Sequence, residues 1–328
     1  MKTKPTVAAP ILLTAVFLLC AIIRLIPQNA FGEGNNPYVS VSLLQLAVFA
    51  VPSLIFMKLR SDGYTKKLRL RLPKQRHVLF TVSAAVVMIL SSVLLNYLML
   101  SLFPDSYTSS AQSYMSASSG SVLGGVYAIV AFAILPALCE EFLFRGIIIA
   151  EYESVGVAAA VLFSSLTFAM SHFSFVRLPV YLFAGLCLAL ILYVTKSLFA
   201  AMIVHAAFNT FSMLGEELCY RIIHRQGAVM FIFALSVLLA VFLIICLGQA
   251  ERIYSYYGAT DADSSYRTEK KKRLSPVAAV LSPPFLALCA LYITINRFIT
   301  TTWPIVVFRN NKTTFFDNLM GHVPMVCR

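Results

Sequence analysis

Long apolar runs separated by short polar segments constrain the fold of this chain more than any other feature of its sequence. The runs cover residues 7–27, 39–58, 77–103, 122–150, 155–173, 178–195, 198–214, 228–248 and 275–296. About 20 apolar residues in a helix span the roughly 30 Å hydrocarbon core of a bilayer. Only 12% of the residues are charged, against about a quarter in soluble domains. We therefore predict an all-α fold, a polytopic bundle of about eight or nine transmembrane helices.

The basic residues are concentrated in alternate connections between these runs. They include Lys2 and Lys4, eight residues from Lys58 to Arg76, and Arg252, Arg267 and Lys270–Arg273, whereas Pro104–Ser121 contains no Lys or Arg. The positive-inside rule then predicts a cytoplasmic N-terminus, with Arg177, Arg221 and Arg225 as a minority on the other side. The net charge of +12 therefore indicates orientation on the lipid bilayer and no nucleic-acid partner.

The first apolar run is predicted to remain as a transmembrane span, because it is about 20 residues long and no small-x-small cleavage site follows it. We expect an integral membrane protein, in the plasma membrane if the chain is bacterial. The seven cysteines are an odd number and contain no C-x-x-C pair. This pattern predicts neither a disulfide framework nor a zinc knuckle.

Two adjacent glutamates, Glu140 and Glu141, lie within the fourth apolar run. A carboxylate at bilayer depth costs roughly 3 kcal/mol on insertion scales, so ionisable groups there usually have a function. On a helix Glu141 can pair with Arg145, four residues later, which leaves Glu140 available as a general base. The alternative is a structural ion pair that only holds helices together.

The same spacing recurs at Glu216, Glu217 and Arg221, beside His224, so the motif alone is weakly specific. This second copy follows the seventh run, where charges are readily hydrated. We interpret it as a solvated face without catalytic function.

Two later runs each carry a histidine paired with a residue four positions away. Phe168 and His172 share one face of the fifth run, and His205 and Asn209 share one face of the seventh. A single histidine in an apolar helix is more often a packing residue than a catalyst. Helix rise, however, places all of these polar groups and Glu140 near mid-bilayer, with His172 the outlier. We predict that they converge on one site.

In this order, Glu140-Glu141-x-x-x-Arg145, Phe168-x-x-x-His172 and His205-x-x-x-Asn209 resemble the three signature motifs of the CPBP family of intramembrane proteases, also called Abi, which includes the CAAX prenyl endopeptidases. The resemblance divides the chain into N-terminal transmembrane helices with a basic cytoplasmic loop (1–121), a CPBP/Abi-like catalytic core (122–214), and C-terminal transmembrane helices with a tail (215–328).

The resemblance implies a hydrolase, a membrane endopeptidase in which Glu140 activates water. We expect His172 to orient that water, His205 and Asn209 to donate hydrogen bonds to the oxyanion, and Arg145 to hold Glu141. The family is also called a metalloprotease family, and Glu140, His172 and His205 would be a suitable zinc ligand set. The absence of an H-E-x-x-H motif argues against zinc, so the sequence leaves both a zinc site and a metal-free site open.

The implied partner is a peptide or membrane-protein substrate in an extended form, reaching the site with water from the cytoplasmic side. Prenylated C-termini would be cut in a eukaryote, and peptide precursors, membrane-protein fragments or immunity-related peptides in a bacterium. Two other functions stay open. One is a proton-coupled transporter, whose helix could be opened by Pro136, and the other is a non-catalytic scaffold that binds a partner through the basic loop.

Overall fold

The computed structural model describes residues 4–25, 37–60, 64–103, 122–260 and 276–302, and all regular elements within these ranges are helical. This confirms the predicted polytopic helical fold. The Ser-rich connection at 107–121 and the connection at 261–273 lie outside the described residues, as does the tail, in which Asn311-Lys312-Thr313 matches the N-glycosylation pattern.

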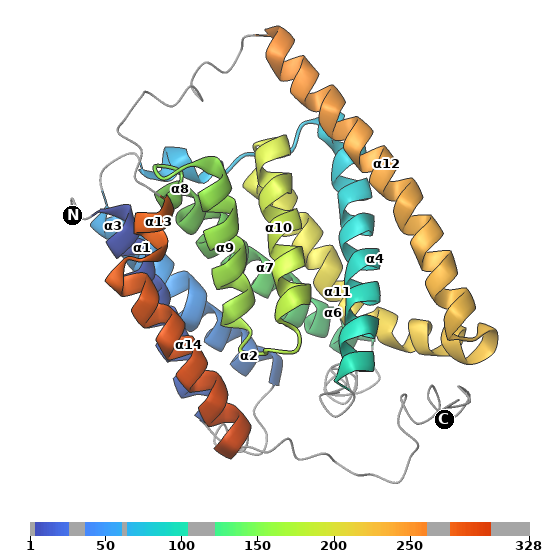
Figure 1. Ribbon diagram of the computed structural model, residues 1–328, viewed down its shortest axis with the longest axis horizontal. Coiled ribbons are helices and arrows are strands. Elements are labelled where there is room, and N and C mark those ends of the chain that lie inside the picture. Colours follow the sequence, from blue (N-terminus) through green and yellow to red (C-terminus); the bar gives the residue numbers. More distant parts are fainter. Residues whose placement is uncertain (1–3, 26–36, 61–63, 104–121, 261–275, 303–328) are drawn as a thin grey trace.

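Figure 1 shows the helices as a bundle with α1 and α14 at one edge and α4 and α12 at the other. The longer helices are α1 (Pro5–Leu25), α4 (Val78–Leu102), α9 (Val157–Ser171), α10 (Leu178–Thr195), α11 (Leu198–Gln226), α12 (Ala228–Thr260) and α14 (Pro283–Thr302). Two further spans are composite. One contains α2 (Pro37–Gln45), η2 (Leu46–Ala50) and α3 (Val51–Leu59), and the other contains α6 (Val122–Ile129), η6 (Val130–Ile134), α7 (Leu135–Glu141), η7 (Phe142–Ile148) and α8 (Ile149–Tyr152). The short helices η3 (Tyr64–Leu68), η4 (Gln75–His77) and α13 (Pro276–Val280) complete the described elements.

Within the described residues, 7 helices are long and apolar enough to cross a membrane. They are Thr6–Ile23, Tyr38–Leu59, Gln75–Leu102, Leu123–Tyr152, Leu178–Thr195, Leu198–Gly215 and Ala228–Gly258. The fifth apolar run forms α9, which is shorter at 15 residues, and the ninth run contributes α14. The fold is thus the predicted one, and these two helices account for the difference between the nine apolar runs of the sequence and the 7 long apolar helices of the described residues.

The composite spans contain π-helical segments next to their polar residues. Segment η2 begins directly after Gln45, and η7 begins directly after Glu141. Segment η6 ends just before Pro136, which has no backbone N–H and so cannot complete the regular hydrogen-bond ladder. Short π-helical segments of this kind often mark functional sites in helices.

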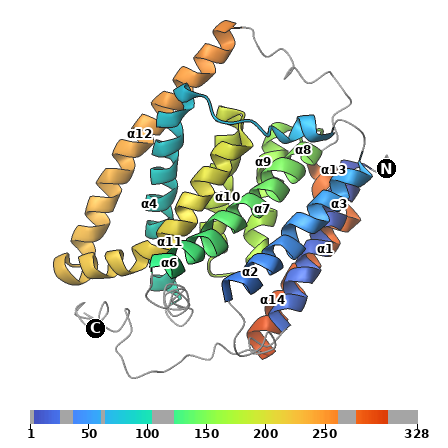
Figure 2. The ribbon, with the colours of Figure 1, turned by 180° about the vertical axis from the view of Figure 1, so that it is seen from behind.

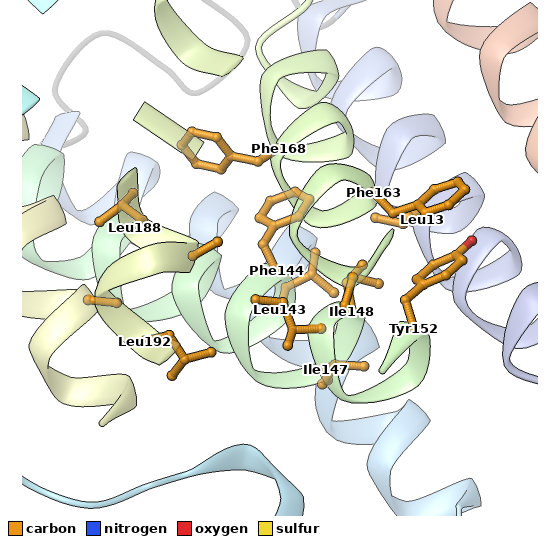
Figure 3. Close-up of a cluster of buried hydrophobic side chains, with 14 of the residues drawn as sticks. Leu13, Leu143, Phe144, Ile147, Ile148, Tyr152, Phe163, Phe168, Leu188 and Leu192 are labelled. Atoms are coloured by element: carbon orange, nitrogen blue, oxygen red, sulfur yellow. The ribbon is translucent and has the colours of Figure 1, made fainter. Parts of the chain in front are cut away.

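A buried apolar cluster holds the middle of the bundle together around η7, α9 and α10. Figure 3 shows Phe144 and Phe168 side by side, and their ring centroids are 5.4 Å apart in an edge-to-face arrangement. Tyr152 stacks on Phe163 with centroids 4.4 Å apart. These contacts fix the α6–α8 span, which carries the glutamates, against α9, which carries His172.

Helices α9 and α10 approach each other closely at Gly185. A Cβ atom at this position would lie 2.9 Å from the Cα of Ser165, closer than real side chains approach a neighbouring backbone. Small residues allow this kind of packing between membrane helices. The carbonyl oxygen of Gly185 then accepts a hydrogen bond of 3.1 Å from Nη2 of Arg145.

Residues 58–60 and 64–76 form an ordered segment, here called the basic strap, across one end of the bundle. In Figures 1 and 2 it runs from α3 past α8 to the start of α4. Arg60 pairs with Glu151, and Arg69 pairs with Glu153. The hydroxyl of Tyr64 also donates to Glu151 Oε1 at 2.8 Å. The predicted basic loop is therefore partly folded onto the bundle.

Burial, and then the neighbouring charge of Glu151, raise the pKa of Tyr64, so the phenol stays protonated and remains a donor at neutral pH. The strap is also attached through its backbone. The carbonyl oxygen of Arg69 accepts a 3.0 Å hydrogen bond from the N–H of Leu198, the first residue of α11. The hydroxyl of Ser197 donates to the carbonyl of Arg71, and its oxygen also caps α11 by accepting from the N–H of Ala200.

Candidate active site

Four of the predicted site residues line a single cavity of about 620 Å³ within the bundle. They are Glu140 on α7, His172 at the end of α9, and His205 and Asn209 on α11. Glu140 and His205 are only 8% and 3% exposed, so both are largely enclosed by protein where they line the cavity. The predicted convergence of the three motifs is therefore present, including His172, which had the weakest support from depth.

Glu141 and Arg145 lie behind this cavity, and both are almost completely buried. Arg145 Nη1 donates to Glu141 Oε1 at 2.8 Å, as their spacing predicts. Arg145 also donates to the Gly185 carbonyl, and its guanidinium lies 4.4 Å from the centroid of the Phe168 ring. These contacts give the guanidinium a carboxylate, a carbonyl and an aromatic face in place of water.

His205 bonds to Glu141, a contact between residues 64 positions apart in the chain. Its Nδ1 lies 2.8 Å from Glu141 Oε1, the same oxygen that binds Arg145. A carboxylate can only accept, so Nδ1 carries the proton and Nε2 is the acceptor nitrogen of the neutral ring. Glu141 therefore fixes the tautomer and the orientation of His205, as a carboxylate does for a catalytic histidine.

His172 is held by a backbone carbonyl and an aromatic ring. Its Nδ1 lies 3.0 Å from the carbonyl oxygen of Phe168, and its ring stacks on Tyr181 with centroids 3.8 Å apart. Because a carbonyl oxygen only accepts, Nδ1 is again the protonated nitrogen and Nε2 the acceptor. Both histidines of the cavity thus carry their proton on Nδ1 and present Nε2 as an acceptor.

Asn209 donates from Nδ2 to the carbonyl oxygen of Ala133 at 3.4 Å, a long and weak hydrogen bond. Ala133 belongs to η6, the π-helical segment that precedes Pro136. The contact links α11 to the glutamate-bearing span and holds the carboxamide at the cavity wall.

Phe168 lies at the centre of these polar groups. Its ring makes edge-to-face contacts with His172 and His205, at centroid distances of 4.9 Å and 5.5 Å, and its other neighbours are Phe144 and Arg145. The first residue of the Phe168-x-x-x-His172 motif thus separates the two imidazoles and covers the guanidinium. Phe168 is 2% exposed and Arg145 is 1% exposed, so water has little access to the guanidinium.

Gln45 is a site residue that the sequence reasoning missed. It lines the cavity, and its Nε2 donates to Glu140 Oε1 at 3.3 Å. It comes from α2, far from the three motifs in sequence. The only available signal was one amide side chain within the second apolar run, where a polar group needs a partner.

The zinc site that the sequence left open has no support from this arrangement. Within the described residues, no three His, Cys, Asp or Glu side chains are grouped so that they could hold a metal ion. Glu140, His172 and His205 line the same cavity, but they are not arranged as a shared ligand set. We therefore assign no step of the chemistry to a metal.

The second Glu-Glu-x-x-x-Arg sequence lies on the distal part of α11, beyond the span that ends at Gly215. Figure 1 shows this part running along the end of the bundle towards α12. The side chains of Glu216 and Glu217 lie outside the described part of the chain. Arg221 and His224 are exposed, in contrast to the buried Arg145.

Residues 122–211 match a family model described as Rce1-like, type II CAAX prenyl endopeptidase Rce1-like. This match confirms the resemblance to the CPBP family, and it supports a CAAX-protease-like intramembrane endopeptidase at the level of the family. No curated protein and no solved structure matches the chain.

Proposed function

We propose that this protein is an intramembrane endopeptidase that hydrolyses a peptide bond with a water molecule activated by Glu140. The observation that carries the proposal is the meeting of Glu140, His172, His205 and Asn209 from three helices at one cavity. The cavity volume of about 620 Å³ is sufficient for an extended peptide segment together with water.

In this proposal the carboxylate of Glu140 takes a proton from the water as its oxygen bonds to the carbonyl carbon of the substrate. Gln45 binds one carboxylate oxygen of Glu140, and the other oxygen acts as the base. Nε2 of His172, the acceptor nitrogen, is suited to position the water by accepting its second proton in a hydrogen bond.

The oxyanion that forms needs donors. Asn209 can supply one, because its bond to the Ala133 carbonyl is long and its carboxamide has a second N–H. His205 binds Glu141 through Nδ1, so it can donate to the oxyanion from Nε2 only when both ring nitrogens carry a proton. As the C–N bond breaks, the proton held by Glu140 passes to the leaving amine.

Glu141 and Arg145 then act as positioning residues and not as acid or base. Neither lines the cavity, and Glu141 is 0% exposed. Their part is to hold His205 in one tautomer and one orientation. The two glutamates thus differ in role because Arg145 and His205 bind one of them and Gln45 binds the other.

Cleavage of a mixed peptide library by the purified protein in detergent tests the proposal. We expect Glu140→Gln to reduce the cleavage rate by about 10²- to 10⁴-fold, the usual contribution of a general base. Glu216→Gln is the matched control, since it makes the same change in the second Glu-Glu pair, and it should leave the rate unchanged. Undiminished cleavage by folded Glu140→Gln protein would exclude this mechanism.

A further inference from the structure

The cavity occupies the half of the bundle that lies away from the basic strap. On α4, which starts at the strap, its lining runs from Ile89 to Leu100 and so covers the far half of the helix. On the span from Tyr38 to Leu59, which ends at the strap, the lining residues Val41 and Gln45 lie in the first two turns.

The lining residues of the other walls also lie away from the basic strap. Helix α11 starts at the strap, and its lining residues extend from His205 to Ile223, beyond the end of the span at Gly215. Helix α12 contributes Phe231 from its first turn, at the end remote from the strap. Glu140 and His205 therefore form the inner floor of a cavity that extends towards the opposite end of the bundle.

Buried side chains fill the space between this floor and the basic strap. Ile147, Ile148 and Tyr152 follow the glutamates along the span, and each is 0% exposed. A Cβ atom on Gly146 would lie 3.5 Å from a methyl carbon of Leu198 and 3.6 Å from one of Leu68, which belongs to the strap. The pairs Arg60–Glu151 and Arg69–Glu153 cover this layer. A peptide could reach Glu140 from the strap end only by displacing this layer of buried side chains.

The distribution of charge orients the two ends. The strap segment from Lys58 to Arg76 carries eight basic residues, whereas the connection from Pro104 to Ser121, at the other end of α4, carries no Lys or Arg. Short connections rich in Lys and Arg stay in the cytoplasm. The cavity therefore extends towards the extracytoplasmic side, which differs from the cytoplasmic access expected from the sequence.

We propose that the substrate reaches Glu140 from the extracytoplasmic side, as an exported peptide or as the extracytoplasmic juxtamembrane segment of a membrane protein. This inference rests on the proposed endopeptidase function. The far walls combine apolar residues with the hydroxyl and carboxamide groups of Ser92, Asn96 and Tyr97. Arg177 also lines the cavity, so its walls suit an extended segment whose backbone groups they can pair, without requiring that the segment be uncharged.

Cysteine accessibility in a bacterial host tests the access side without depending on cleavage. Ser212 lines the cavity and is exposed, and Gln75 is exposed on the strap, so Ser212→Cys and Gln75→Cys form a matched pair. Intact spheroplasts and lysed cells are treated with a membrane-impermeant maleimide, and the adduct at each introduced cysteine is quantified by mass spectrometry. Asn96→Cys is a second cavity reporter in case Ser212→Cys does not accumulate.

We expect Ser212→Cys to be modified equally in intact and lysed spheroplasts, and Gln75→Cys to be modified at least tenfold more after lysis. Modification of Ser212→Cys only after lysis would overturn the proposed access side. The two proposals fail separately. Labelling from outside without any cleavage contradicts only the endopeptidase, whereas cleavage with the reversed labelling pattern contradicts only the direction of access.

Discussion

At the scale of single residues, the site distinguishes two neighbouring glutamates by their partners. Glu141 is bound on one oxygen by Arg145 and His205, while Glu140 faces the cavity with one contact from Gln45. The pairing of Glu141 with Arg145 follows from their spacing along one helix. The bond between His205 and Glu141 depends on how α7 and α11 face each other, so the sequence alone did not predict it.

Gln45 provides a prediction at this scale. Replacing it with Leu removes the donor to Glu140 Oε1 while keeping a side chain of similar size. A hydrogen bond to a charged group contributes about 1.5–3 kcal/mol, so we expect kcat to fall by about 10- to 100-fold with little change in KM. Peptide cleavage by the purified variant measures both constants.

Gln75→Leu is the control for this experiment, because Gln75 is an exposed glutamine on the basic strap, remote from the cavity. The isosteric variant Gln45→Glu keeps an acceptor but loses the amide donor, and it should not restore kcat. A normal kcat in Gln45→Leu would show that the hydrogen bond from Gln45 to Glu140 does not contribute to catalysis.

At the scale of helices, the apolar runs predicted the positions of the elements well, because burial in lipid requires nearly continuous apolar sequence. The π-helical segments at η2, η6 and η7 were not predicted. Pro136 indicated an irregularity, but no residue pattern distinguishes a π-helical turn from a break in the helix. The contact of α9 with α10 at Gly185 likewise depends on helix rotation, which an apolar run does not specify.

Gly185→Ala tests that contact. The new methyl group would lie 2.9 Å from the Cα of Ser165, so α9 and α10 must move apart and the Arg145 bond to the Gly185 carbonyl must change. Overpacking of this kind costs about 1–3 kcal/mol. Thermal unfolding in detergent micelles should show a lower midpoint than in the wild type.

The matched control is Gly248→Ala on α12, where an added Cβ atom meets no atom within 4 Å. Alanine is favoured over glycine within a helix, so this variant should be as stable as the wild type or slightly more stable. Equal destabilisation by the two substitutions would show that close packing at Gly185 is not the cause.

At the scale of the whole molecule, the basic strap joins the early spans to the part of the chain that carries the motifs. Charge placement predicted where this segment begins and ends, but not that it folds onto the bundle. Nothing in the sequence marks Glu151 and Glu153, at the end of a span, as its ion-pair partners. Only the folded arrangement pairs them with Arg60 and Arg69, 91 and 84 residues away in the chain.

Arg60→Gln tests the strap as a structural element. Glu151 is 4% exposed, and loss of its guanidinium partner leaves a buried carboxylate that still accepts a hydrogen bond from the hydroxyl of Tyr64. Breaking a buried pair in this way costs about 3–5 kcal/mol. We expect a lower free energy of unfolding in detergent, measured by denaturant titration.

Lys66→Gln is the control on the same strap, because Lys66 is exposed and its removal should change stability by less than about 0.5 kcal/mol. Similar losses in both variants would indicate that the net charge of the strap, and not the Arg60–Glu151 pair, stabilises the bundle.

In the proposed endopeptidase, the depth of the cavity limits which polypeptides can be cut. The α4 wall extends from Ile89 to Leu100, a helix rise of about 16 Å. A polypeptide in extended form advances about 3.3 Å per residue, so about five unstructured residues must enter before a scissile bond reaches the floor. A compact domain with a shorter unstructured end would be too bulky to serve as a substrate. The choice of substrate would then depend on the length of its unstructured end as well as on its side chains.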